Sequence, residues 1–152
     1  MDDQFSFQIN IPSDEDGYIL LQCPLCGELF KLSVKDIDDE DVFDIWCPFC
    51  GLTSVNYLTD EVIELAMIKA KNNLDNFVHH EIKKIERKIK RNYISFKITS
   101  KPAYEFESPL IPIIDSLIVI DFKCCNRTAK VSPSLKTTIV FCPFCGVYYE
   151  HK

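Results

Sequence analysis

Apolar and polar residues alternate in several short stretches of the chain, and this period of two is typical of half-buried β-strands. The stretch over residues 5–11 follows this pattern most clearly in the first third of the sequence, and the mainly apolar residues 18–22 are predicted to form a second strand. Two shorter apolar stretches lie at residues 29–32 and 45–46. The pattern predicts four short strands before residue 58, which suffice for one small antiparallel β module.

The period changes between residue 59 and about residue 92, where apolar side chains recur every three or four positions, as on one face of an α-helix. Thr59 or Asp60 suits the start, because a short polar side chain caps the first turn and a negative charge complements the helix dipole. At 1.5 Å per residue, such a helix extends on the order of 50 Å, more than one small module covers. We therefore expect it to bridge two modules or to pair with a second copy of the chain.

The remainder of the chain returns to strand-like patterns. Residues 93–99 alternate again, and residues 117–122 form an apolar stretch after a loop with three prolines. The order of elements repeats that of the first part, and Ser-Phe-Gln-Ile at residues 6–9 corresponds to Ser-Phe-Lys-Ile at residues 95–98. We therefore predict an internal duplication.

The predicted fold class is α+β, with two small antiparallel β modules at residues 1–58 and 93–152, joined by the long amphipathic helix of residues 59–92. The composition, 47% hydrophobic and 26% charged, is that of a folded domain and not of a disordered chain. No apolar run reaches the roughly 18 residues that a membrane span requires. The acidic start of the sequence lacks the features of a secretory signal, so we expect a cytoplasmic protein.

Six of the eight cysteines form three Cys-Pro-x-Cys-Gly segments, which we call knuckles. Cys23 and Cys26 form the first knuckle, and Cys47 and Cys50 form the second after an interval of 20 residues. Two such pairs are the pattern of a tetrahedral four-thiolate zinc site, and in a reducing compartment they favour metal binding over disulfides. The two intervening residues let one tight turn direct both sulfurs at one ion, and the glycine that follows tolerates a positive φ. We call this predicted zinc site the first cysteine site.

The second set of ligands is less regular, because Phe122 occupies the position that Cys23 has in the first half. Cys124 is the nearest replacement, although neighbouring side chains on a strand point to opposite faces, so a bulge or turn at residues 123–126 is required. His151 is an alternative fourth ligand. The expected second zinc site, the second cysteine site, consists of Cys124, Cys125, Cys142 and Cys145.

The three knuckles resemble those of the zinc-ribbon superfamily, including the ribbons of transcription factors. The resemblance covers both halves of the chain but not the helix. It implies two β-hairpin knuckles that clamp each zinc, a small antiparallel sheet behind them, and contact with nucleic acid or protein machinery instead of catalysis. Phe122 departs from the family pattern in the second half.

Four thiolates complete a zinc coordination sphere and leave no position for an activated water, so we predict that the protein is not an enzyme. A rubredoxin-like iron carrier is an alternative, because similar knuckles hold a single iron in such proteins. His79 and His80 do not form a zinc-protease motif, because lysines stand where its second histidine would lie.

Charge is distributed unevenly along the chain. Residues 1–61 carry a net charge of −12 and residues 62–152 carry +6. An acidic loop is a candidate contact for a protein partner or simply a solubilising tip; it comprises Asp36, Asp38, Asp39, Glu40 and Asp41. A basic cluster near the end of the predicted helix is a candidate contact for nucleic acid or an acidic partner, or an ordinary solvated helix end; it comprises Lys83, Lys84, Arg87, Lys88, Lys90 and Arg91.

These features together predict a non-enzymatic adaptor or regulatory protein with two structural zinc ions that contacts nucleic acid or a protein of a nucleic-acid-handling machine. The alternative is an assembly protein that forms homo-oligomers through the helix of residues 59–92 without binding nucleic acid.

Overall fold

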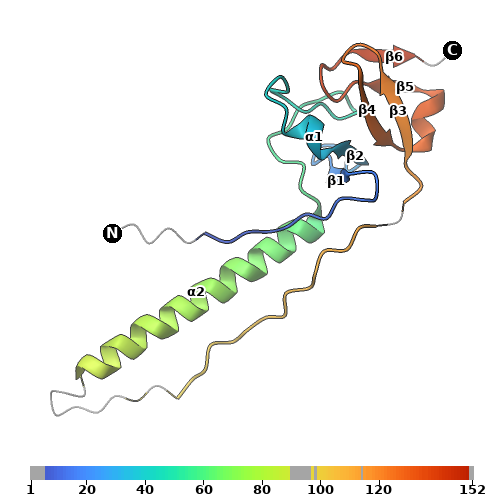
Figure 1. Cartoon of the computed structure of the whole chain (residues 1–152). Coiled ribbons are helices and arrows are strands. Elements are labelled where there is room, and N and C mark those ends of the chain that lie inside the picture. Colours follow the sequence, from blue (N-terminus) through green and yellow to red (C-terminus); the bar gives the residue numbers. More distant parts are fainter. Residues whose placement is uncertain (1–5, 90–96, 98, 114, 151–152) are drawn as a thin grey trace. The chain divides into compact units, whose positions relative to one another are not determined.

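The computed structural model describes residues 6–89, 97, 99–113 and 115–150 (Figure 1). The predicted α+β class is confirmed, with one long helix and two small antiparallel sheets. The chain divides into two compact units. The helical unit combines Met1–Ile9 with Glu61–Pro109, and the β unit combines Asn10–Asp60 with Leu110–Lys152. The β unit therefore draws on both predicted modules.

The larger sheet contains two hairpins, one from each half of the sequence, in the order β1-β2-β4-β3 with every neighbouring pair antiparallel. The inner strands β2 and β4 join the hairpins, with Lys31 opposite Lys130 and Leu32 opposite Ala129. The strands are β1 (Tyr18–Gln22), β2 (Leu29–Ser33), β3 (Ile118–Phe122) and β4 (Arg127–Val131). The two halves of the repeat thus share one sheet.

The smaller sheet pairs β5 (Ile139–Phe141) with β6 (Tyr148–Glu150), on either side of the third knuckle. Two short helical turns, α1 (Val34–Ile37) and η1 (Pro133–Thr137), follow β2 and β4. In place of the strand predicted at residues 45–46, Trp46 makes a single bridge to Thr53.

The hydrophobic core of the β unit covers one face of the larger sheet. Phe30 and Leu32 lie on this face, since they are two positions apart on β2, and both are fully buried. Across the ladders they meet Leu21 of β1 and Ala129 of β4, which are also buried. Buried Cys23, Cys47 and Cys142 belong to the same cluster, so the knuckles form part of the core.

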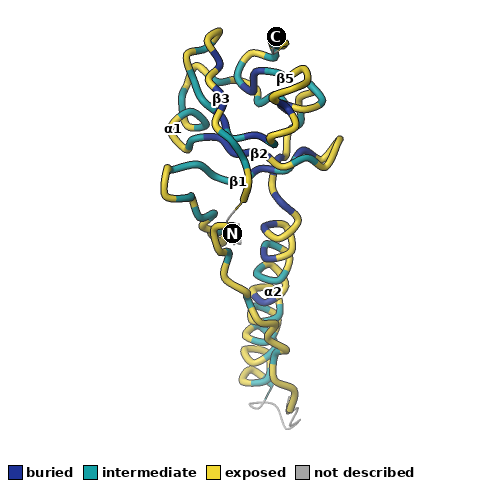
Figure 2. Tube along the Cα trace, turned by 90° about the vertical axis from the view of Figure 1, so that its right-hand side faces the viewer, coloured by how far each residue is buried: buried dark blue, intermediate teal, exposed yellow. Residues whose placement is uncertain are grey.

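The helical unit contains α2 (Asp60–Ile89) apart from its first residue, and α2 confirms the predicted long helix as far as the described residues extend. Only Val62, Leu65 and Asn72 of its 30 residues are buried, and Figure 2 colours most of the remainder as intermediate or exposed. The Lys69 ammonium donates to the backbone carbonyl of Gln8 at 3.2 Å, which joins the segment near the N-terminus to the helix.

The extended segment of residues 99–109 lies along α2 and is bound by the Asn72 side chain. The Asn72 amide donates to the carbonyl of Glu105 at 2.8 Å and accepts from the N–H of the same residue at 2.9 Å. Lys71 also pairs with the Glu105 carboxylate. Tyr104 and Phe106, on either side of Glu105, are exposed.

The strands predicted at residues 5–11 and 93–99 are not confirmed. The strand predicted at residues 5–11 is wrong for the described residues 6–11, which form no strand because no neighbouring strand pairs with them. Most of the strand predicted at residues 93–99 lies outside the described residues. Within the described part of the chain, no helix is both long enough and apolar enough to cross a membrane.

Candidate metal centres

The first cysteine site is formed by two knuckles that the fold brings face to face. Cys23 and Cys26 lie in the turn between β1 and β2, and Cys47 and Cys50 lie in the loop that follows α1. The sulfur of Cys23 is 3.8 Å from that of Cys50, and the sulfur of Cys26 is 3.6 Å from that of Cys47. All four Sγ atoms lie within 4.8 Å of one another.

Hydrogen bonds within each knuckle explain why the sequence folds into this turn. In the first knuckle, the N–H of Gly27 donates to the carbonyl of Cys23 at 2.8 Å. The equivalent bonds, from Gly51 to Cys47 and from Gly146 to Cys142, are each 2.9 Å long. The three glycines have φ between 69° and 78°, a conformation that glycine adopts without steric cost. The motif therefore encodes a turn that points two sulfurs in one direction.

The structure also brings Cys124 and Cys125 together with the third knuckle in the second cysteine site. The sulfur of Cys145 is 3.4 Å from that of Cys124, and the sulfur of Cys142 is 3.9 Å from that of Cys125. These four Sγ atoms also lie within 4.8 Å of one another. Cys124 therefore occupies the position of the fourth ligand, which the sequence alone left undecided. His151, the alternative ligand, lies outside the described residues.

A tight turn at residues 123–126 explains how two adjacent cysteines serve the same site. Asn126 has φ of 53°, the left-handed conformation that Gly27 has at the equivalent position of the first half. The N–H of Cys125 donates to the carbonyl of Phe122 at 3.2 Å and closes the turn. In a turn, unlike a strand, successive side chains do not alternate between opposite faces, so both sulfurs can face the third knuckle.

The sulfur positions fit a tetrahedral ion. A Zn–S distance of 2.3 Å gives a tetrahedron with edges of about 3.8 Å. The four sulfur–sulfur distances given above, two from each site, run from 3.4 to 3.9 Å, close to the edge of this tetrahedron. Thiolates of this arrangement suit soft ions such as zinc and iron.

The environment of the thiols is also that of metal ligands. Burial raises the pKa of Cys47 and of Cys142 well above that of an ordinary thiol, and raises the pKa of Cys125 to about 11. Burial acts to raise the pKa of Cys23, but hydrogen bonds from backbone N–H groups of its own knuckle and from the thiols of Cys26 and Cys47 together lower it. Several thiolates at such short separation repel one another unless a cation lies between them, so each set of four cysteines is arranged as a group that can hold a metal ion.

Tyr149 is a residue of the second cysteine site that the sequence did not single out. Its hydroxyl accepts a hydrogen bond from the N–H of Cys124 at 2.9 Å, and its ring packs against Phe122 with centroids 6.0 Å apart. Burial acts to raise the pKa of the Cys124 thiol, but hydrogen bonds from Tyr149 and the neighbouring thiols lower it. Tyr149 thus positions Cys124, and the aromatic residue at Phe122, where the first half has a cysteine, supports it.

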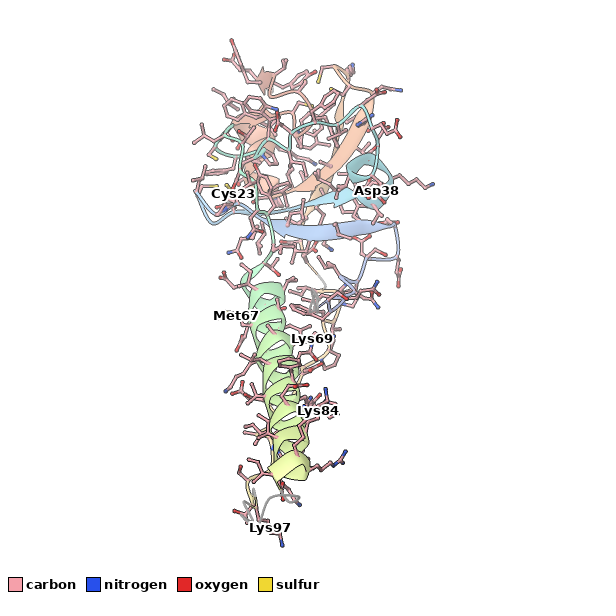
Figure 3. The ribbon with its side chains drawn as sticks, turned by 90° about the vertical axis from the view of Figure 1, so that its left-hand side faces the viewer. Cys23, Asp38, Met67, Lys69, Lys84 and Lys97 are labelled. Carbon is pink, nitrogen blue, oxygen red and sulfur yellow. The ribbon has the colours of Figure 1, made fainter. Side chains whose placement is uncertain are left out.

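The predicted basic cluster lies on the exposed surface of α2 as far as it is described. Lys83, Lys84, Arg87 and Lys88 are exposed, and Figure 3 labels Lys84 on the helix. Lys84 forms an ion pair with Glu81 at 2.6 Å. Lys90 and Arg91 lie outside the described residues.

The predicted acidic loop makes contacts within the chain. Arg127 of β4 pairs with Asp39 at 2.8 Å and approaches Asp36 at 3.8 Å. These two carboxylates therefore hold the loop against the second hairpin. The other three acidic residues, Asp38, Glu40 and Asp41, are exposed, and so is the neighbouring Phe43.

Comparison with known proteins found no matching family model, no matching curated protein and no matching solved structure. The function of the chain is therefore inferred from its own residues and geometry.

Proposed function

We propose that the chain is a non-enzymatic adaptor whose β unit is held together by two structural zinc ions. The observation that carries this proposal is the grouping of all eight cysteines into two sets of four, each with its sulfurs within 4.8 Å of one another. Four protein ligands fill a tetrahedral zinc site and leave no position for water or substrate, so such a site stabilises a fold instead of activating a nucleophile. The resemblance of the knuckles to zinc ribbons supports the same assignment.

The metal is tested by elemental analysis and native mass spectrometry of the purified protein. We expect two zinc ions per chain and no visible absorption. One ion per chain would refute the second site, and a coloured protein containing iron would favour the rubredoxin-like carrier instead.

The partner surface of the adaptor is the basic end of α2, and the partner is a nucleic acid or another polyanion. Four exposed cations lie within six residues there, and a helix can place such side chains along a phosphate backbone. Binding is measured by fluorescence anisotropy with labelled single-stranded DNA, duplex DNA and RNA at low and physiological salt. We expect binding that weakens steeply with salt and is lost when Lys83, Lys84, Arg87 and Lys88 are replaced by Glu.

A matched control replaces four exposed lysines elsewhere, Lys35, Lys101, Lys123 and Lys136, by Glu. This variant carries a comparable charge change, so retained binding would assign the contact to α2. Equal losses in both variants would indicate only a general electrostatic attraction, and no binding at low salt would refute the nucleic-acid contact.

A second candidate function, assembly through α2, is favoured by a stripe of exposed apolar side chains spaced four or seven residues apart. The stripe consists of Ile63, Met67, Leu74, Val78 and Ile85. Light scattering coupled to size-exclusion chromatography distinguishes this function from the first. A homo-oligomer that dissociates in Met67→Glu/Leu74→Glu but persists in Ile111→Glu, which changes an exposed residue outside the helix, would support assembly. A monomeric wild-type protein would refute it.

A further inference from the structure

The internal repeat and the sheet register together reveal an axis in the β unit. Aligning Cys26 with Cys125 makes Lys31 equivalent to Lys130. The structure places these same two lysines directly opposite each other on the antiparallel strands β2 and β4. Equivalent residues face each other across an antiparallel ladder when a two-fold axis passes between them, as at the interface of a symmetric dimer.

The second and third knuckles are related by the same two-fold axis. The N–H of Trp46 donates to the carbonyl of Pro143 at 2.9 Å, and the N–H of Phe141 donates to the carbonyl of Pro48 at 2.9 Å. Trp46 and Phe141 each precede the first cysteine of a knuckle, and the two prolines each follow it. Each knuckle therefore gives and receives the same hydrogen bond.

The side chains repeat this exchange. A Cβ atom added to Gly51 would lie 2.8 Å from the Phe141 ring, and one added to Gly146 would lie 2.7 Å from the Trp46 ring. Each aromatic ring thus covers the glycine that ends the other knuckle. These contacts are closer than side chains tolerate, so the fit depends on glycine at both positions.

Ion pairs on the far side of the sheet from the core follow the same axis. Lys31 pairs with Asp115 at 2.5 Å, and Lys130 pairs with Asp16 at 2.6 Å. Asp16 and Asp115 are equivalent in the repeat, since each precedes its aligned cysteine, Cys26 or Cys125, by ten positions. Backbone hydrogen bonds, aromatic contacts and ion pairs therefore each occur twice, in equivalent positions on the two halves.

We infer that the β unit is an internal dimer of two metal modules and that its two metal sites fill cooperatively. The physical reason is that Pro48 lies between the ligands Cys47 and Cys50, and Pro143 lies between Cys142 and Cys145. A metal ion that orders one knuckle also fixes the carbonyl and glycine on which the aromatic residue of the other knuckle rests. The two binding free energies are then coupled, and the coupling is equal in both directions. This inference rests on the proposed metal sites.

Equivalent ligand substitutions test the coupling. Cys145→Ser disables the second cysteine site and Cys50→Ser disables the first, and zinc affinity at the intact site is measured by competition with a chelator. We expect each substitution to weaken the opposite site by about 5- to 150-fold, with the same factor in both directions, as for a typical allosteric coupling. Unchanged affinity at the intact site would refute the coupling, whereas a wild-type protein that binds no zinc would refute the proposed function itself.

An uncoupling variant that keeps all eight cysteines separates cooperativity from loss of folding. Trp46→Ala/Phe141→Ala removes both rings that cover the opposite knuckles. In this background, Cys145→Ser is expected to change the affinity of the first cysteine site by less than about twofold, following the logic of a double-mutant cycle. Phe43→Ala, which removes an aromatic side chain that is 90% exposed, is the control and should leave the coupling intact. Undiminished coupling in Trp46→Ala/Phe141→Ala would show that the coupling does not depend on these two rings.

Discussion

Lys31 and Lys130 face each other across the join between β2 and β4, and both ammonium groups contact one carboxylate oxygen of Asp14, at 3.2 and 2.8 Å. Two like charges at opposite positions of a ladder repel each other, and the Lys31 side chain is only 5% exposed. Asp14, with Asp16 and Asp115, offsets this repulsion. The carboxylates therefore make the shared sheet compatible with a lysine pair at its centre.

Replacing Asp14 by Asn tests this role. We expect the free energy of unfolding of the zinc-loaded protein to fall by about 1–3 kcal/mol, because Lys31 and Lys130 lose the charge they share. The measurement is urea denaturation monitored by tryptophan fluorescence. Glu15→Gln, at an exposed neighbouring position, is the matched control and should be nearly neutral. Equal stability of Asp14→Asn and the wild type would show that the other two carboxylates suffice.

Removal of metal is expected to unfold the β unit. Fully buried Cys23, Cys47 and Cys142 belong to its hydrophobic core, so a metal-free site leaves thiols close together without the ion that they would coordinate. A strong chelator should abolish the near-ultraviolet circular dichroism of the aromatic residues, and added zinc should restore it. Retention of this signal in the metal-free protein would contradict a structural role for the metal.

Zinc affinity is expected to rise with pH. Burial raises the pKa of Cys47 and Cys142, so their thiols remain protonated at neutral pH until a metal ion displaces the protons. Each proton released on binding makes the affinity about tenfold stronger per unit of pH below the thiol pKa, so acidification favours the metal-free form. Chelator competition at several pH values, with proton release measured in parallel, gives the number of protons. An affinity independent of pH between 6 and 8 would contradict this expectation.

Glycine substitutions separate backbone strain from contact across the internal axis. Gly27 and Gly146 both have positive φ, at 78° and 73°. Apart from the two adjacent residues, no described residue has an atom within 4 Å of a Cβ at Gly27, whereas Trp46 obstructs one at Gly146. Gly27→Ala should therefore cost about 1–2 kcal/mol from the left-handed conformation alone. Gly146→Ala should cost about 1–3 kcal/mol more because of the clash, as measured by denaturation of the zinc-loaded variants. Equal costs would mean that Trp46 moves aside freely.

Asn72 is expected to anchor the extended segment that lies along α2. This side chain is 2% exposed, and its amide bonds both backbone groups of Glu105. Asn72→Ala leaves these groups without partners, so chymotrypsin should cleave after the exposed Tyr104 and Phe106 several-fold faster than in the wild type. Asn73→Ala, which changes the exposed neighbour, should leave the cleavage rate unchanged. Equal cleavage of the two variants would contradict the anchoring role.

The sequence predicts those features that depend on local patterns. The spacing of Cys23, Cys26, Cys47 and Cys50 is fixed by the geometry of one turn and one ion, so the first cysteine site follows directly from it. The helix at α2 follows from its period, and the strands β1 and β2 follow from the short, mainly apolar stretches on either side of the first knuckle. The repeat also indicates that two similar hairpins exist.

The union of these hairpins in one sheet could not be predicted in the same way. The pairing of Lys31 with Lys130 depends on a tertiary contact between distant segments, and periodicity carries no information on which strand edges meet. Similarly, the roles of Arg127 and Tyr149 arise from neighbours that only the folded chain supplies. The sequence does not specify how the adjacent Cys124 and Cys125 are directed, because their turn requires a positive φ at Asn126, a conformation uncommon outside glycine.

The join between β2 and β4 also sets an order of events during synthesis. A ribosome that adds about 5–20 residues per second adds Lys31 about 5–20 s before Lys130. The first four cysteines are complete by residue 50, so the nascent chain can capture an ion while the inner edge of β2 still awaits its partner strand. An unpaired strand edge readily associates with other chains. Slower translation therefore lengthens the time for which the β2 edge is open to such association.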